Sequence, residues 1–221
     1  MKPAKNILYK GMGLSTEEMK HRSAEYLKII LQRRSVRNFS SESIPKEIIQ
    51  DCLRAANSAP SGANMQPWHF VVAANKNIKH EIRTKAEVEE REFYSGRAPD
   101  EWLEALSPLG TDSNKEFLET APYLVIIFER KFEKLPGGKI KKHYYTKESV
   151  GIATGFLITA IHNAGLVSLT HTPSPMNFLN GICNRPANEK PFLILAVGLP
   201  AEIANVPDIH KKEIDETATF I

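Results

Sequence analysis

The sequence contains no long apolar run and no sign of a targeting segment. No stretch approaches about 18 consecutive apolar residues, the length that a membrane-spanning helix requires. The first ten residues, Met1 to Lys10, also lack the apolar core of a secretion signal. We therefore expect a cytoplasmic protein with no membrane partner.

Cysteine and strong charge of one sign are scarce as well. The chain has two cysteines, Cys52 and Cys183, and neither belongs to a metal-binding or redox spacing. Both lie among apolar neighbours, so we expect buried, reduced thiols and no metal site. The formal net charge is only +3, with lysine and arginine spread along the chain, which gives no reason to expect a nucleic-acid partner.

What the sequence does contain is an ordinary globular composition. Of its 221 residues, 42% are apolar and 25% are charged, enough to bury a substantial core. No internal repeat or composition shift divides it. We therefore predict one domain spanning residues 1–221.

The spacing of apolar residues alternates between helical and extended patterns. Ser15 and Glu18 have capping-box spacing at the start of the first expected helix. The expected helices are 15–34, one that begins near Pro45, 79–94, a short one at 102–106, and 147–166. The expected strands are 68–74, 123–130, 166–172 and 191–198. Because helices precede and separate the strands, the pattern predicts an α+β fold with a sheet covered by helices.

The expected helix 147–166 is apolar on nearly every side, which places it between layers or in a subunit interface. Gly151 and Gly155 would let another backbone approach it, and Gly165 has the position of its C-cap. The tail, about 201–221, is too polar for a core and is expected to form an arm lying across a neighbour. The weakly patterned segment between the helix 79–94 and the strand 123–130 is typical of a lid or of disorder.

Three short motifs could carry chemistry. Arg33, Arg34, Ser35 and Arg37 place three guanidinium groups and a hydroxyl within five residues, which suits a phosphate. The alternative is a solvated helix end whose arginines face the helix dipole.

The second motif, "SAPSGANMQPW" at 58–68, is denser in turn-forming residues than an ordinary loop requires. Gly62 would let its backbone approach a ligand, and Ala63 and Asn64 could offer backbone N–H groups. The third, "THTPSP" at 170–175, puts Thr170 and Thr172 at a strand end, where hydroxyls can reach ligands. A common turn and a β-branched strand end are the simpler explanations of these two motifs.

Taken together and in this order, "RRSVR", "PSGANMQPW" and "AGLVSLTHTP" resemble the nitroreductase superfamily of FMN enzymes. The resemblance extends from about residue 22 to 215. It implies a central, mostly antiparallel sheet flanked by helices, and an intertwined homodimer with FMN at its interface.

The segments "HEIRTKAEVEEREFY", "NKEFLETAP" and "HYYTKESV" are similar to the iodotyrosine deiodinase branch of that superfamily. Vertebrate members of the branch carry a membrane anchor, and we expect a soluble form without one here. The branch binds a zwitterionic amino acid through a Glu, a Tyr and a Lys on a lid at about 90–115. The matching residues are Glu90, Tyr94 and Lys115, of which Glu90 would otherwise be interpreted as a solvated helix charge.

The resemblance also implies which residues hold the flavin. Arg33, Arg34, Ser35 and Arg37 would bind the FMN phosphate and ring edge, joined by Lys211 or its neighbour Lys212. Pro60, Ser61 and Gly62 would bound the isoalloxazine from the partner subunit, with Thr170, His171 and Thr172 also lining it. The Thr172 hydroxyl near flavin N5 would be the catalytic group, and the Ala63 N–H would bind the substrate phenolate.

The function implied is reductive removal of halogen from halotyrosines, giving tyrosine and halide, with NAD(P)H or an unidentified reductase as electron donor. The alternatives are a general NAD(P)H-dependent nitroreductase or quinone reductase, and a flavin-binding protein without turnover. The lid separates the first two, because a nitroarene has no zwitterion for Glu90, Tyr94 and Lys115 to bind.

Overall fold

The computed structural model describes residues 4–221, and the described chain divides into two units at Arg33/Arg34. The first unit holds helix α1 (Thr16–Leu31), whose capping box between Ser15 and Glu18 is formed as expected. No residue of α1 is buried. The second unit, 34–221, holds the sheet and all other helices. The expectation for residues 1–3 lies outside the described residues, and the single-domain boundaries stay a prediction.

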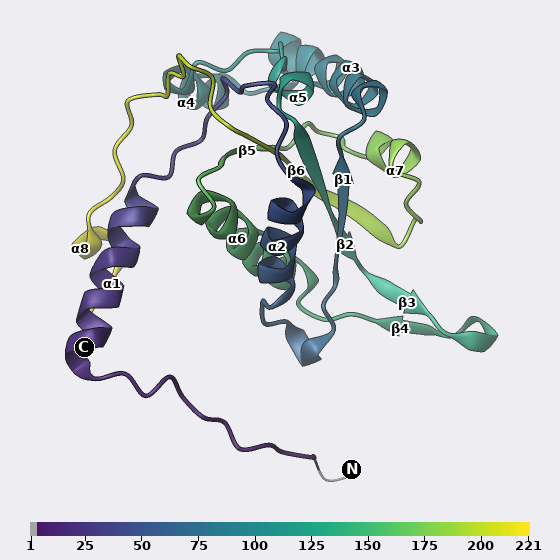
Figure 1. Cartoon of the computed structure of the whole chain (residues 1–221). Helices are drawn as coiled ribbons and strands as arrows, with labels where there is room; N and C mark the ends of the chain where they lie inside the picture. Colours follow the sequence, from purple (N-terminus) through teal and green to yellow (C-terminus); the bar gives the residue numbers. More distant parts are fainter. Residues whose placement is uncertain (1–3) are drawn as a thin grey trace. The chain divides into compact units, whose positions relative to one another are not determined.

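The second unit is built on a four-stranded sheet with the strand order β1-β2-β6-β5 (Figure 1). Every pairing in it is antiparallel. The strands are β1 (Trp68–Ala73), β2 (Tyr123–Arg130), β5 (Val167–His171) and β6 (Glu189–Gly198). All four expected strands are therefore confirmed to within two residues at each end, and so is the α+β class.

Helices cover both faces of this sheet because its central strands are apolar on both sides. On one face, Val125 and Leu195 pack with α2 (Lys46–Asn57) and α6 (Thr146–Asn163). On the other, Ile126 and Ile194 pack with the helices α3 (Lys76–Glu92), α5 (Phe117–Thr120) and α7 (Phe178–Ile182). Successive strand residues point to opposite faces, which is why consecutive residues belong to different clusters.

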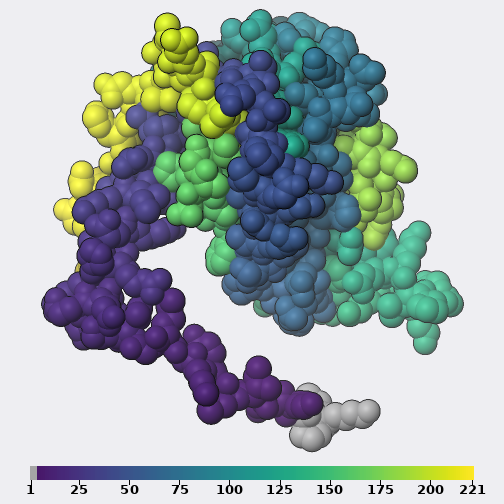
Figure 2. Space-filling view, viewed as in Figure 1, coloured from purple at the N-terminus to yellow at the C-terminus, as the bar shows by residue number. Residues whose placement is uncertain are grey.

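The segment between α3 and α5 is more structured than its sequence pattern indicates. It contains a π-turn (Phe93–Arg97), α4 (Asp100–Leu106), which confirms the short helix expected at 102–106, and a 3-10 turn (Ser107–Leu109). Beyond β2 the chain forms a hairpin of β3 (Phe132–Lys134) and β4 (Ile140–Lys142) around the turn Pro136–Gly138, which the sequence analysis missed. This hairpin projects from the body of the second unit (Figures 1 and 2). The tail carries one short helix, α8 (Ile214–Thr217).

Helix α6 is buried on one side only. Val150, Ala153 and Leu157 are fully buried, but Ile152 and Phe156 remain 43% and 42% exposed. A Cβ added at Gly151 or Gly155 would meet nothing within 4 Å, so no other part of the described chain makes the close approach that we expected. Gly165 has a positive φ of 79° just after the helix, as its expected capping position requires.

No helix in residues 4–221 is both long and apolar enough to cross a membrane.

Candidate functional site

The three lid residues Glu90, Tyr94 and Lys115, here called the lid cluster, lie together. Lys115 Nζ is 3.0 Å from Glu90 Oε2, and these side chains are only 3% and 13% exposed. The same Nζ lies 5.5 Å from the centre of the Tyr94 ring. Glu90 lies in the last turn of α3, and Tyr94 lies in the π-turn that follows it, four residues further along the chain. The cluster thus holds one charge of each sign in a largely dry setting.

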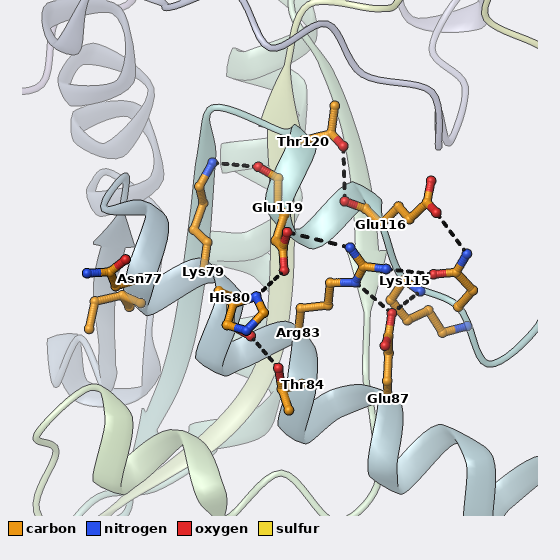
Figure 3. Close-up of polar contacts among 12 residues, drawn as sticks. Asn77, Lys79, His80, Arg83, Thr84, Glu87, Lys115, Glu116, Glu119 and Thr120 are labelled. Atoms are coloured by element: carbon orange, nitrogen blue, oxygen red, sulfur yellow. Dashed lines mark hydrogen bonds and ion pairs between the residues drawn. The ribbon is translucent and has the colours of Figure 1, made fainter.

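Lys115 is fixed at both its backbone and its side chain. Its N–H donates to Glu87 Oε1 at 2.8 Å, and its Nζ donates to Thr111 Oγ1 at 3.1 Å and to the Asp112 carbonyl. Figure 3 shows Glu87 also accepting from Arg83, which reaches on to Glu119 of α5. Residue 115 is therefore tied to α3 one turn before Glu90.

The Tyr94 hydroxyl is set up to donate a hydrogen bond. Burial and the nearby Glu90 carboxylate raise its pKa, while a hydrogen bond with Thr111 and the Arg37 charge act in the opposite direction. The net shift is upward, so the phenol keeps its proton at neutral pH. A protonated phenol beside a lysine suits the carboxylate of a ligand.

Aromatic contacts and a guanidinium connect the start of the lid to α4 and α3. Phe93 makes edge-to-face contacts with Tyr94 at 5.3 Å and with Trp102 at 5.0 Å between ring centres. Arg97 donates to the Glu89 carbonyl at 2.6 Å and to its carboxylate at 3.0 Å. These contacts join the start of the lid to α3 and α4.

The arginine segment runs beside strand β5. Ser35 forms a parallel bridge with Ser168, and Val36 N–H donates to the Ser168 carbonyl at 3.3 Å. Continuing this register places Arg37 beside Thr170, in keeping with its electrostatic influence on Tyr94. Arg34 donates to the Pro207 carbonyl, which brings the tail to this segment. Arg33 belongs to the first unit, so its side chain is not placed relative to the others.

The end of β5 presents different side chains to its two faces. Thr170 and Thr172 are exposed, whereas His171 between them is buried. His171 contacts Phe117 of α5 edge to face, with 5.5 Å between ring centres, and so lies on the α3–α5 face of the sheet. Its ring therefore faces the lid cluster rather than lying with the two threonine hydroxyls.

Residues 58–68, here called the glycine loop, are shaped by backbone. Ala63, Asn64 and Gln66 all have positive φ, near 50°, which is uncommon outside glycine and is stabilised only by surrounding contacts. Ser61 supplies two such contacts, because its carbonyl accepts from Asn64 N–H and its hydroxyl from Gln66 N–H, each at 3.0 Å. Ala63 is an exposed residue, and its N–H has no hydrogen-bond partner among residues 4–221.

Gly62 is favoured by the lack of space for a side chain. A Cβ there would lie 3.0 Å from the Tyr144 carbonyl oxygen and 3.1 Å from Tyr145 Cδ2. Its N–H donates to Ser149 Oγ at 3.3 Å, which joins the loop to the start of α6. Pro60, just before it, is exposed.

Within one chain the sheet separates the glycine loop from the end of β5, where His171 approaches the lid cluster. The loop leads into β1 and Thr172 follows β5, and these strands are the two opposite edges of the sheet. Three strand spacings amount to about 14 Å before any loop is counted. A site that used both would have to be completed by a second chain.

Two further sequence expectations fare differently. Cys52 is a buried free thiol as predicted, but Cys183 is only partly buried, because it follows the short helix α7 at the margin of the core. Burial raises its pKa to about 11, which keeps it unreactive. Lys211 and Lys212 are exposed in the tail. Among the described residues no group of three or more His, Cys, Asp or Glu could hold a metal ion.

Sequence reasoning missed four residues that build the lid cluster: Arg83, Glu87, Thr111 and Asp112. Arg83 and Glu87 have the spacing of a helical ion pair, which was a usable signal. Thr111 and Asp112 had none, because only the folded loop brings them to Lys115.

Comparison with known proteins agrees with this geometry. The sequence profile of the nitroreductase family matches residues 30–199. The chain therefore belongs to the nitroreductase family.

Within that family the chain is similar to iodotyrosine deiodinases. It is 55% identical to that of Haliscomenobacter hydrossis over 94% of this chain and 93% of the relative. It is 41% identical to that of Danio rerio over 98% of this chain and 74% of the relative. A crystal structure of oxidized iodotyrosine deiodinase bound to FMN and 3-iodo-L-tyrosine superposes with a TM-score of 0.75 at 31% identity, covering 88% of this chain and 100% of that one.

Proposed function

We propose that this protein is an FMN-dependent enzyme that reductively removes halogen from halogenated tyrosines, giving tyrosine and halide. The lid cluster is the observation that carries the proposal. Its buried Glu90–Lys115 pair offers a carboxylate to an ammonium and an ammonium to a carboxylate within one site. An amino acid zwitterion can insert between the two charges, whereas a nitroarene or quinone cannot replace either partner.

The residues present suit FMN. Gly62 lets the glycine loop pack closely against Tyr144 and Tyr145, and the Ala63 N–H has no hydrogen-bond partner among residues 4–221. Arg34, Ser35 and Arg37 would bind the phosphate and the ring edge along β5, with Arg33 and Lys211 or Lys212 joining them. When bound and reduced, FMN supplies the two electrons that, with one proton, replace the carbon–halogen bond by a carbon–hydrogen bond and release halide.

The two ends of the substrate would be bound by different segments. The Ala63 N–H binds the phenolate oxygen, and Glu90, Tyr94 and Lys115 bind the zwitterion. Closing the lid over the ligand excludes water from the reacting atoms. Thr172, at the exposed end of β5, would donate a hydrogen bond from its hydroxyl to the flavin, with Thr170 alongside, whereas the His171 ring faces the lid cluster.

A homodimer follows from where the two segments lie. The glycine loop leads into the edge strand β1, whereas the lid cluster approaches His171 at the end of the opposite edge strand β5, so the loop of one subunit would meet the lid of the other. The exposed Ile152 and Phe156 on α6, with Gly151 and Gly155 open beside them, give an apolar face for that contact. A cytoplasmic location, and NAD(P)H or a separate reductase as electron donor, stay predictions from the sequence.

Titration of the oxidised holoprotein with 3-iodotyrosine, tyrosine and 2-iodophenol, followed by flavin fluorescence, tests the proposal. We expect iodotyrosine to bind far more tightly than iodophenol, which has no zwitterion. Anaerobic mixing of the reduced protein with iodotyrosine should then release tyrosine and iodide in equal amounts. Reduction of nitroarenes but no iodide release would instead establish a general nitroreductase, and binding without oxidation of the flavin a carrier.

A further inference from the structure

The side chain of His171 has an unused hydrogen-bonding atom aimed at the lid cluster. Its Nε2 is buried and has no hydrogen-bond partner among residues 4–221. That atom faces Glu90 Oε1 across 4.0 Å, while the other carboxylate oxygen, Oε2, pairs with Lys115 at 3.0 Å. A buried polar atom without a partner is costly, so its persistence here calls for a partner in another state of the site.

The environment of His171 keeps its ring neutral. The charged groups that face it are Glu90 from α3 and Lys115 from the segment before α5, while Phe117 of α5 closes one side. Burial, and secondly the Lys115 charge, lower its pKa to about 3. A neutral imidazole carries one N–H, which Nε2 can donate to a carboxylate without adding a positive charge.

The distance between His171 Nε2 and Glu90 Oε1 is typical of a site without its ligand. At 4.0 Å the Nε2–Oε1 separation is longer than a hydrogen bond, and such contacts in ligand-free sites often shorten when a ligand binds. A substrate ammonium that takes the place of Lys115 at Oε2 would separate Glu90 from the lysine with which it pairs. Glu90 would then need a second donor to hold its orientation.

We propose, building on the function above, that His171 is a positioning residue for the substrate ammonium. On binding, His171 Nε2–H donates to Glu90 Oε1 and fixes the carboxylate so that Oε2 meets the ammonium. Lys115 is released from Glu90 to bind the substrate carboxylate together with Tyr94. The closed ion pair of the ligand-free chain is thus exchanged for two ion pairs with the substrate, and His171 supports the exchange.

Two variants of His171 in the holoprotein test this role. His171→Phe keeps a planar ring against Phe117 but removes the donor, and His171→Gln restores an N–H donor of similar reach. We expect His171→Phe to weaken 3-iodotyrosine binding roughly tenfold. Its affinity for 2-iodophenol and for FMN should not change. His171→Gln should bind iodotyrosine within about threefold of the native protein.

A matched control and a double variant separate positioning from packing. His21→Phe, at an exposed histidine of α1, should leave iodotyrosine affinity unchanged. On a Glu90→Gln background, His171→Phe should cause no further loss, because the two act as one unit. Between pH 5 and 8 the iodotyrosine affinity of the native protein and of His171→Gln should depend on pH in the same way, because the His171 ring is neutral throughout this range.

The proposal is overturned if His171→Phe binds iodotyrosine as the native protein does, or if His171→Gln is as weak as His171→Phe. If Glu90→Gln weakens binding while His171→Phe does not, the proposed function stands and the role of His171 is wrong. If the native holoprotein binds iodotyrosine no better than iodophenol, the proposed function itself fails.

Discussion

The glycine loop is defined by its backbone conformation, whereas the lid cluster is defined by interactions between side chains. The loop works with backbone: Ala63, Asn64 and Gln66 at positive φ, and Gly62 with no room for a Cβ. The lid cluster works with side chains, where Glu90 and Lys115 pair within a network that reaches back to Arg83. A backbone site tolerates few substitutions at its glycine but is indifferent to charge, whereas the side-chain site depends on charge and on pH.

The largest effect is expected at Thr172, which follows β5 and belongs to neither of the two regions compared. Thr172→Ala removes the hydroxyl that we place at the reacting edge of the flavin. Loss of one positioned donor of this kind lowers turnover by roughly 10²-fold. FMN affinity should change little, because the phosphate contacts are elsewhere. Iodide release per bound flavin measures the effect, and an unchanged rate would remove Thr172 from the mechanism.

The next largest effect is expected from Glu90→Gln, which changes only the charge of the side chain. The substitution keeps the shape and one acceptor but removes the partner of the substrate ammonium. A hydrogen bond to a charged group contributes about 1.5–3 kcal/mol, so halotyrosine binding should weaken roughly 10- to 150-fold. The lid near 95–113 should also stay open to proteases in the presence of ligand.

Glu81→Gln, an exposed residue on the same helix, is the matched control for Glu90→Gln and should change nothing. Halophenol binding should be equal in the native protein and both variants. Equal iodotyrosine affinity in native and Glu90→Gln protein would show that Glu90 does not bind the substrate ammonium.

In the glycine loop, Gly62→Ala should change the shape of the backbone without changing any charge. The added Cβ meets the Tyr144 carbonyl and the Tyr145 ring, so the loop must shift at a cost of about 1–2 kcal/mol. We expect FMN affinity to fall roughly tenfold in titrations of the apoprotein. Gly181→Ala, where a Cβ meets nothing within 4 Å, is the control. A Gly62→Ala protein with native FMN affinity would contradict a backbone-built flavin contact.

The smallest effect concerns Glu87, which supports the lid cluster. Burial alone would raise the pKa of Glu87, but hydrogen bonds from Lys115 N–H and Arg83 outweigh it and lower the pKa. Because the folded pKa lies below the unfolded one, this contribution to stability is present above the unfolded pKa. It is lost as the pH falls through the folded pKa.

Glu87→Gln should therefore lower the free energy of unfolding by about 1 kcal/mol at pH 7 and flatten its decline in acid. Urea unfolding at about pH 7 and about pH 3, well below the unfolded pKa, measures both effects, with Glu81→Gln as the control. If the free energy of unfolding of Glu87→Gln falls in acid as steeply as that of the native protein, the Glu87 carboxylate does not stabilise the fold.

The comparison also explains what the sequence could reveal. The strands were predictable because Leu124 to Phe128 form an uninterrupted apolar run, and the glycine loop was noticeable because turn-forming residues concentrate there. Hairpin β3–β4 was missed because each strand has only three residues, too few to show a period.

The lid cluster could not be derived from the sequence pattern. Glu90 lies among several glutamates of α3, and Lys115 is far along the chain, so only a family resemblance selected them. The pairing of Glu90 with Lys115, and the approach of His171, depend on how α3, the lid and β5 pack together. No spacing in the sequence encodes such contacts.

A mixed dimer tests most directly whether the glycine loop of one subunit and the lid cluster of the other share a halotyrosine. One subunit carries Gly62→Val and the other Glu90→Gln, purified together through two different affinity tags. If the sites are shared between subunits, both defects fall in one site and the other site is intact, so the mixed dimer should keep half of the native iodide release. If each site is built within one chain, neither site is intact, and turnover no higher than that of the two parent variants would contradict the account.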